Sequence, residues 1–191
     1  MASIDHSFFF VLYSFAGRSH IGDFLIIFFG EYFLYIIFAI LAYFLYRAYR
    51  NKKRKEVYGY FVALFAALFA RFGVENVIHF FYHRPRPFIA LHLPHLLSDM
   101  SYSFPSGHTI FMFALATGIF FVNRKFSYFL YASGLVIGLA RVMGGVHYPS
   151  DILGGAILGI LTGYIVYKLL ERFGPKRNGI SPIRSSKKIF S

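Results

Sequence analysis

Five long apolar segments dominate the chain and restrict it to a small set of folds. They lie at residues 24–46, 57–82, 105–122, 126–143 and 149–170. A helix needs about 20 residues to cross the hydrocarbon core of a bilayer, so the third segment qualifies only if its helix begins near Pro105. No segment shows strand alternation, and lipid permits only helices or closed barrels. The sequence therefore predicts an all-α integral membrane protein, a bundle of five transmembrane helices.

The composition supports a membrane protein over a basic soluble one. The chain is 57% hydrophobic, whereas soluble domains are about 45–50% apolar. Its net charge of +12 would suit a nucleic-acid partner in a soluble protein, but here the apolar excess indicates basic loops on a membrane domain. We expect no nucleic-acid partner. The absence of cysteine excludes disulfides and thiolate metal ligands.

The two ends of the chain differ from the apolar segments. Residues 4–16 are apolar but too short to cross a bilayer, so we expect an N-terminal interfacial helix lying on the membrane. Residues 1–173 then form one membrane-embedded domain. Residues 174–191 form a polar, basic tail.

Basic residues mark one side of the predicted bundle. Arg and Lys gather at 47–55, at 124–125 and after the fifth apolar segment. These three regions alternate to the same side, which the positive-inside rule assigns to the cytoplasm. The C-terminus is then cytoplasmic, and the second-to-third and fourth-to-fifth links lie together outside it.

These two outer links carry the residues that could bind a ligand or take part in a reaction. The sequences are "HRPRPF" and "PSGH" in the first link and "ARVMGGVHYPSD" in the second. They supply eight candidate site residues: Arg84, Arg86, Ser106, Gly107, His108, Arg141, His147 and Asp151.

Several of these residues suit an anion. Gly107 allows close approach to the backbone, and a helix beginning near Pro105 would offer free N–H groups and the positive end of its dipole. Arg86 and Arg141 can each present a planar fork of donors to phosphate oxygens. We therefore expect a phosphate or carboxylate to bind here.

Two histidines could act on the bound anion. His147 and Asp151 are one helical turn apart, so the carboxylate can keep one ring nitrogen protonated and leave the other free to attack. His108 is suited to protonating a leaving oxygen. These residues alone do not decide which histidine is the nucleophile, and each taken singly could be a cap, a turn or a basic loop.

Together, the three stretches resemble the signature of the type 2 phosphatidic acid phosphatase superfamily. Its motifs are Lys-x6-Arg-Pro, Pro-Ser-Gly-His and Ser-Arg-x5-His-x3-Asp. The second is complete at 105–108, and the third runs from Arg141 through His147 to Asp151. Two positions depart from the pattern, with His79 in place of the Lys and Ala140 in place of the Ser.

The resemblance implies a phosphatase that needs no metal or other cofactor. His147 would attack phosphorus to form a phosphohistidine, Asp151 would orient it, and His108 would protonate the leaving group and then assist water. Candidates for binding the phosphoryl oxygens are Arg86, Ser106, Gly107, Arg141, His79 and Arg84.

The resemblance also suggests substrate and location. The chain is similar to the bacterial undecaprenyl-diphosphate phosphatases, which implies a multi-pass protein of the bacterial plasma membrane with an extracytoplasmic site. Phosphatidylglycerophosphate, phosphatidic acid or lipid A phosphate would suit the same constellation. A non-catalytic lipid-binding or transport module on this fold is the alternative of another class, and the oligomeric state is left open.

The histidine at position 79 belongs to a polar stripe. Arg71, Glu75, His79 and His83 recur every four residues on the second apolar segment. A neutral His79 would bind phosphate less strongly than Lys, unless Glu75 helps to keep it charged. The stripe could equally hold a structural Arg71–Glu75 pair. His92, His95 and Asp99 match no trusted metal-ligand spacing, so we expect no metal.

Overall fold

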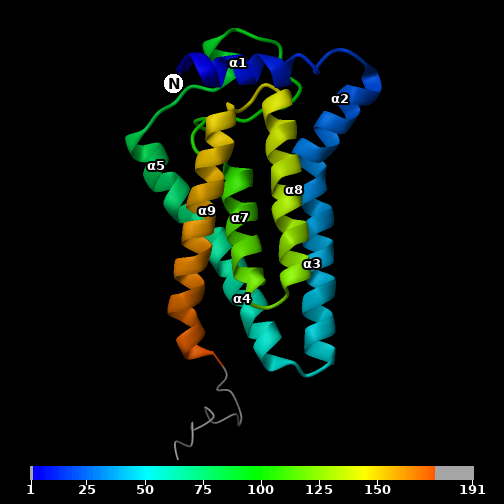
Figure 1. Cartoon of the computed structure of the whole chain (residues 1–191), viewed down its shortest axis with the longest axis vertical. Coiled ribbons are helices and arrows are strands. Elements are labelled where there is room, and N and C mark those ends of the chain that lie inside the picture. The colour runs from blue at the N-terminus through cyan, green and yellow to red at the C-terminus, as the bar shows by residue number, and fades with distance from the viewer. Residues whose placement is uncertain (1, 175–191) are drawn as a thin grey trace, which may run out of the picture.

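The structure, a computed structural model, describes residues 2–174. Figure 1 shows a bundle of upright helices with one helix lying across its upper end. The helices are α1 (Ala2–Tyr13), α2 (His20–Ile27), α3 (Phe33–Arg50), α4 (Arg54–Leu68), α5 (Glu75–Phe81), α6 (Pro87–Ala90), α7 (Gly107–Phe120), α8 (Arg124–Met143) and α9 (Pro149–Leu170). A 3-10 turn, Glu171–Phe173, follows α9. The π-helical turns Phe28–Tyr32 and Phe69–Val74 join α2 to α3 and α4 to α5.

The all-helical architecture is confirmed, with four long apolar helices in the described residues. The candidate spans are His20–Arg50, Arg54–Phe81, Arg124–Met143 and Pro149–Phe173. Each of these spans contains one of the predicted apolar segments, except that residue 82, the last of the second segment, lies outside its span. Each span is longer than its segment because the helix continues into the polar residues of the flanking links. Large apolar side chains such as Phe65, Phe72 and Ile157 are exposed on the outside of the bundle, as suits a lipid-facing surface.

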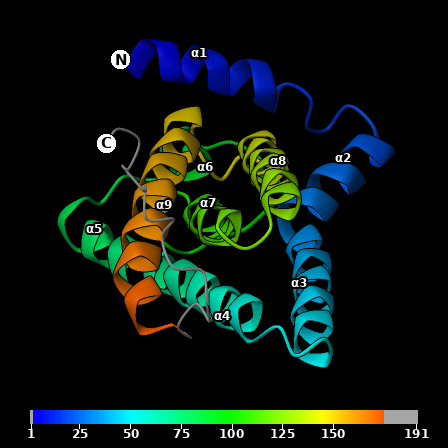
Figure 2. The ribbon, with the colours of Figure 1, turned by 60° about the horizontal axis from the view of Figure 1, so that its bottom comes forward.

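The third apolar segment differs from the prediction. Its helix, α7, begins at Gly107 rather than near Pro105, and it is about 21 Å long at 1.5 Å per residue. All but two of its residues are buried. Figure 2 shows α7 in the middle of the bundle, enclosed by α4, α8 and α9. Because its neighbours cover it, α7 can be apolar all round without having the length of a lipid-facing span.

Small residues bring α9 against α7. A Cβ atom added at Gly155 would lie 3.0 Å from the carbonyl oxygen of Ser106. At Gly159 and Gly163 it would lie 2.6 Å from the carbonyl oxygens of Ile110 and Ala114. The glycine spacing therefore serves packing within the bundle. It also holds the start of α7 beside the start of α9.

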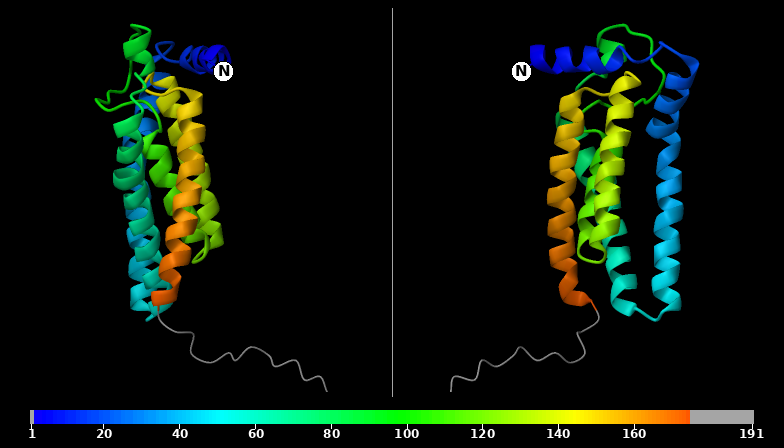
Figure 3. Two further views of the ribbon diagram at one scale, coloured as in Figure 1. Left: turned by 90° about the vertical axis from the view of Figure 1, so that its left-hand side faces the viewer. Right: turned by 45° about the vertical axis from the view of Figure 1, so that its right-hand side comes forward.

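Both links that carry the motifs lie at the end covered by α1. Figures 1 and 3 show the long connection from α5 to α7 and the short one from α8 to α9 at this end, and the α3–α4 and α7–α8 turns at the other. In the short link, Gly145 has φ +87°, a left-handed conformation that glycine adopts at no steric cost. Phe9 of α1 is fully buried and packs with Val142, Tyr148 and Ile152. The predicted basic tail, residues 174–191, lies beyond the described residues apart from Gly174.

Candidate active site

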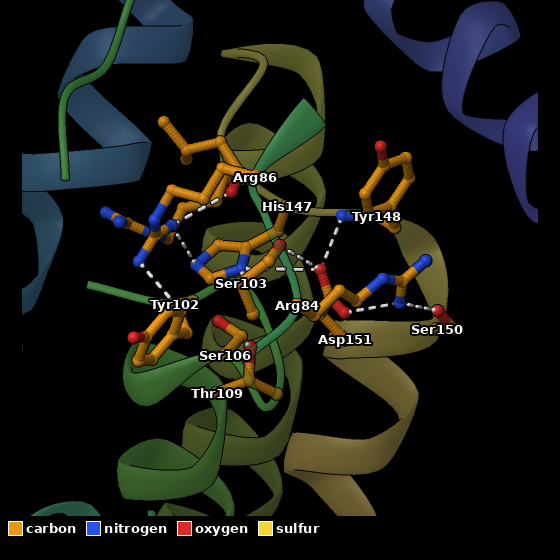
Figure 4. A network of polar contacts seen from close by, with 12 residues as sticks. Arg84, Arg86, Tyr102, Ser103, Ser106, Thr109, His147, Tyr148, Ser150 and Asp151 are labelled. Carbon is orange, nitrogen blue, oxygen red and sulfur yellow. Dashed lines mark hydrogen bonds and ion pairs between the residues drawn. The ribbon is translucent and has the colours of Figure 1, made fainter. Parts of the chain in front are cut away.

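The ring of His147 is held in one orientation by a backbone carbonyl. Its Nδ1 lies 2.8 Å from the carbonyl oxygen of Ser103. A carbonyl can only accept, so Nδ1 carries the proton and Nε2 has a free lone pair. Nε2 lies 3.1 Å from Nη1 of Arg86, which donates to it. Figure 4 shows the ring between Arg86 on one side and Asp151 on the other.

His147 is a neutral base in these surroundings. The residue is 1% exposed. Burial, followed by the positive charges of Arg141 and Arg86, holds the pKa of His147 well below its ordinary value of 6.5. The imidazole therefore keeps its lone pair at neutral pH, as a nucleophile requires.

Asp151 lies beside His147, with Ser103 between them in the hydrogen-bond network. Its Oδ2 is 3.7 Å from Nδ1 of His147, beyond hydrogen-bond distance. Oδ2 accepts instead from the hydroxyl of Ser103 at 2.6 Å and from the backbone N–H of Tyr148 at 2.7 Å. The second contact caps α9, since Asp151 is the third residue of that helix. Asp151 thus fixes the two segments that present His147.

Arg84 forms ion pairs with Asp151 and with Asp5 of α1. Its guanidinium donates to Oδ1 of Asp151, to Oδ2 of Asp5 and to the hydroxyl of Ser150, each at 2.6 Å. It also lies 4.1 Å above the ring of Tyr148. These bonds tie α1 to the start of α9, and the phosphate contact that the sequence suggested for Arg84 stays a prediction.

Backbone carbonyl groups hold the guanidinium of Arg86 beside His147. It donates to the carbonyl oxygens of Val146 at 2.9 Å and Ser101 at 2.8 Å. Burial is the main reason that its pKa falls to about 10, which still leaves the guanidinium charged at neutral pH. The arginine is therefore a fixed cation beside Nε2 of His147.

Arg141 faces the same space from α8. Its Nη1 donates to the carbonyl oxygen of Gly30 at 3.2 Å, within the π-helical turn Phe28–Tyr32, and lies 3.4 Å from Oε1 of Glu31. A carboxylate joins it to Arg86, because Oδ2 of Asp99 is 2.8 Å from Arg86 and 2.9 Å from Arg141. Burial by itself would raise the pKa of Asp99. The contacts with Arg86, the Ser101 amide and Arg141 outweigh burial, and the pKa of Asp99 falls to about 2.

The start of α7 leaves donors available. Ser106 is the N-cap residue, but its side chain makes no capping bond and accepts from Thr109 at 3.1 Å. The first N–H groups of a helix lack partners within it, so those at Gly107 and His108 can serve an anion. His108 and Gly107 line a cavity of about 170 Å³ between α3 and α4, whose other walls include Phe38 and Leu68.

His79 follows Glu75 in the predicted polar stripe. Oε1 of Glu75 is 2.7 Å from Nη1 of Arg71 but 3.8 Å from Nε2 of His79. The arginine is therefore the nearer partner of the carboxylate. Within residues 2–174, Oε2 of Glu75, Nε2 of His79 and Nε of Arg141 are buried without a hydrogen-bond partner. Three such atoms around one space favour a polar ligand there.

Sequence reasoning missed two residues of this site. Ser103 had no signal of its own, because a single serine two positions before a proline is common in loops. Asp99 was considered only beside His92 and His95 as a metal ligand, and it pairs with two arginines instead. In the described part of the chain, no group of three His, Cys, Asp or Glu side chains is arranged to hold a metal ion.

The chain is similar to known proteins in sequence and in structure. Residues 59–175 match the profile of the PAP2 superfamily. Undecaprenyl-diphosphatase BcrC of Bacillus subtilis is 35% identical over 104 residues, which are 53% of this chain and 53% of that protein. The chain therefore aligns with about half the length of this relative.

Two further proteins are similar over more of their length. The bacitracin transport permease protein BcrC of Bacillus licheniformis is 29% identical over 73% of this chain and 68% of its own. The crystal structure of Aquifex aeolicus LpxE superposes with a TM-score of 0.68, at 26% identity, over 86% of this chain and 95% of that one.

Proposed function

Because the chain belongs to the PAP2 superfamily, we propose that it is a membrane enzyme that removes a phosphate group from a lipid phosphate or diphosphate. The observation that carries the proposal is the geometry of His147. Its Nδ1 donates to the Ser103 carbonyl, so the lone pair of Nε2 faces the cationic space beside Arg86. A fixed neutral nucleophile among phosphate-binding groups is what phosphoryl transfer without a metal requires.

The reaction has two steps. Nε2 of His147 attacks phosphorus, the bond to the leaving oxygen breaks, and His108 gives that oxygen a proton. Water then attacks the phosphohistidine, His108 takes a proton from it, and inorganic phosphate leaves with His147 restored. The donors for the phosphoryl oxygens are Arg86, Arg141 and the backbone N–H groups at the start of α7.

The substrate that we propose first is undecaprenyl diphosphate. Its support is the similarity to an undecaprenyl-diphosphatase and the apolar walls of the cavity beside His108, which suit a lipid chain. The leaving group is then undecaprenyl phosphate. Phosphatidylglycerophosphate, phosphatidic acid and lipid A phosphate are the alternatives, since the same donors would bind their phosphates.

We propose that the protein lies in the bacterial plasma membrane with its site on the outer side. Residues 1–173 form the membrane domain, with α7 as a short fifth transmembrane helix enclosed by the others and α1 on the interface. The exposed apolar side chains of α1, among them Phe8 and Val11, support that location. The basic links and the tail are cytoplasmic, and the site is extracytoplasmic.

The test is phosphate release by the purified protein in detergent, with EDTA present. Wild type should hydrolyse undecaprenyl diphosphate, and His147→Ala should reduce the rate by several orders of magnitude because no nucleophile replaces the imidazole. His20→Ala, at an exposed histidine at the start of α2, is the matched control and should retain activity. Turnover that survives in His147→Ala would rule out the phosphohistidine route.

A non-catalytic transport or lipid-binding role is the second candidate. It is favoured by one observation, the name of the Bacillus licheniformis relative as a transport permease protein. Binding of lipid phosphates without release of phosphate from any of the four candidate substrates would select this role.

A further inference from the structure

One carboxylate occupies the space between the two buried arginines of the site. Arg86 and Arg141 are 2% and 1% exposed, and each places its Nη2 within 2.9 Å of Oδ2 of Asp99. Buried cations need a compensating charge. Asp99 supplies that charge to both arginines.

The donors that Asp99 takes are those that a phosphoryl group needs. Nη1 of Arg86 lies 3.1 Å from Nε2 of His147, and Nη2 of the same guanidinium holds Asp99. In-line attack requires phosphorus about 3–3.5 Å from Nε2, which brings its oxygens to these arginines. Two anions at one pair of guanidinium groups repel each other, so they compete for the site.

Asp99 is also placed where it can leave. It lies in the loop between α6 and α7, outside any helix, and its side chain is 22% exposed while the arginines are enclosed. Two contacts to Ser101 hold the carboxylate, at 3.1 Å from the backbone N–H and 2.9 Å from the hydroxyl. Loop segments move at a lower cost than helices.

We propose that Asp99 sets the affinity of the phosphate site, holding Arg86 and Arg141 in place when the site is empty and competing with the phosphoryl group for them. This rests on the proposed function in one respect, the identity of the incoming anion. The competition weakens the binding of substrate and of inorganic phosphate alike, so the same carboxylate assists release of the product.

The test is Asp99→Asn, which retains the shape of the side chain and removes its charge. Binding of inorganic phosphate is measured from the shift of the unfolding temperature of the detergent-solubilised protein. We expect Asp99→Asn to bind phosphate roughly tenfold more tightly than wild type, since no fixed anion competes. Its unfolding temperature without phosphate should be lower, because, among the described residues, Arg86 loses its carboxylate partner and Arg141 keeps only Glu31, at 3.4 Å. With lipid substrate, KM should fall while kcat stays equal or decreases.

Two control variants define what the charge does. Asp99→Glu keeps a competing carboxylate and should bind phosphate with near wild-type affinity. Asp23→Asn changes a carboxylate that accepts from the Gly17 N–H, outside the site, and should leave phosphate binding unchanged.

The outcomes separate this proposal from the proposed function. Phosphate binding by Asp99→Asn that equals or is weaker than that of wild type would overturn the role of Asp99. A wild-type protein that hydrolyses no lipid phosphate, combined with tighter phosphate binding by Asp99→Asn, would overturn the proposed function and support the role of Asp99.

Discussion

At the residue scale, the proposed nucleophile is oriented by a backbone carbonyl. Nδ1 of His147 donates to the carbonyl oxygen of Ser103. Asp151 does not bond to the ring but accepts from the Ser103 hydroxyl and from the Tyr148 backbone N–H. A single carboxylate thereby secures both segments next to the imidazole. The loss of that carboxylate would affect the position of His147 more than its charge.

The acid limit of activity follows from the environment of His147. Arg86, Arg141, Asp99 and Asp151 are the charged groups around it, and burial with the two arginines lowers the pKa of its imidazole below 6.5. Protonation of Nε2 abolishes the nucleophile, and a lowered pKa moves this loss to more acidic pH. We expect the ¹⁵N signals of His147 in the free protein to titrate below pH 6.5. Titration at or above 6.5 would contradict the neutral, buried nucleophile.

His79 offers a second test at this scale. Glu75 pairs with Arg71 at 2.7 Å, so the imidazole at 79 receives little of that negative charge. A lysine there would be a permanent cation beside the bound phosphate. We expect His79→Lys to keep or raise kcat/KM for lipid phosphate at pH 7. Loss of activity in a correctly folded His79→Lys variant would show that the site depends on the imidazole itself.

At the scale of elements, the close contact of α7 with α9 is what aligns the motifs. The backbone N–H of Ser106 donates to the carbonyl oxygen of Asp151 at 3.1 Å, and this bond joins the first turns of the two helices. The glycines of α9 permit the approach, because any side chain would meet the backbone of α7. Packing and active-site geometry are therefore coupled.

Gly159→Ala tests this coupling. The new Cβ would lie 2.6 Å from the Ile110 carbonyl oxygen and 3.0 Å from the backbone nitrogen of Ala114, so the helices must separate. Overpacking of this kind costs about 1–3 kcal/mol. We expect a lower unfolding temperature in detergent and reduced turnover. Gly73→Ala is the control, since its Cβ would meet only the half-exposed ring of Phe69 at 3.1 Å. Equal stability of the two variants would argue against the helix contact as the cause.

At the scale of the whole molecule, the two ends of the bundle have different roles. One end carries α1, the motif-bearing links and the ion pairs of the site, and the other carries the basic turns between α3 and α4 and between α7 and α8 (Figure 3). Under the proposed orientation, lipid phosphates of the outer leaflet reach the site directly.

Cysteine labelling tests that orientation, because the chain has no cysteine of its own. Ser98→Cys lies in the exposed α6–α7 loop and Asn51→Cys in the exposed α3–α4 turn. We expect an impermeant thiol reagent to label Ser98→Cys in intact cells and to label Asn51→Cys only after lysis. The reverse pattern would place the site in the cytoplasm and exclude outer-leaflet substrates.

The sequence by itself determined the class of fold and named most of the candidate site residues. Apolar length predicts spanning helices because lipid cannot satisfy a bare backbone. The proximity of His147 to Asp151 is also local, since His147 lies two residues before α9 and Asp151 lies in its first turn. The tertiary structure alone decided which groups are partners. Ser103 and Asp99 joined the site, Arg84 turned to Asp5 and Asp151, and α7 proved to be enclosed. These contacts join segments far apart in the chain, so their geometry depends on how the whole bundle packs and leaves no periodic trace in the sequence.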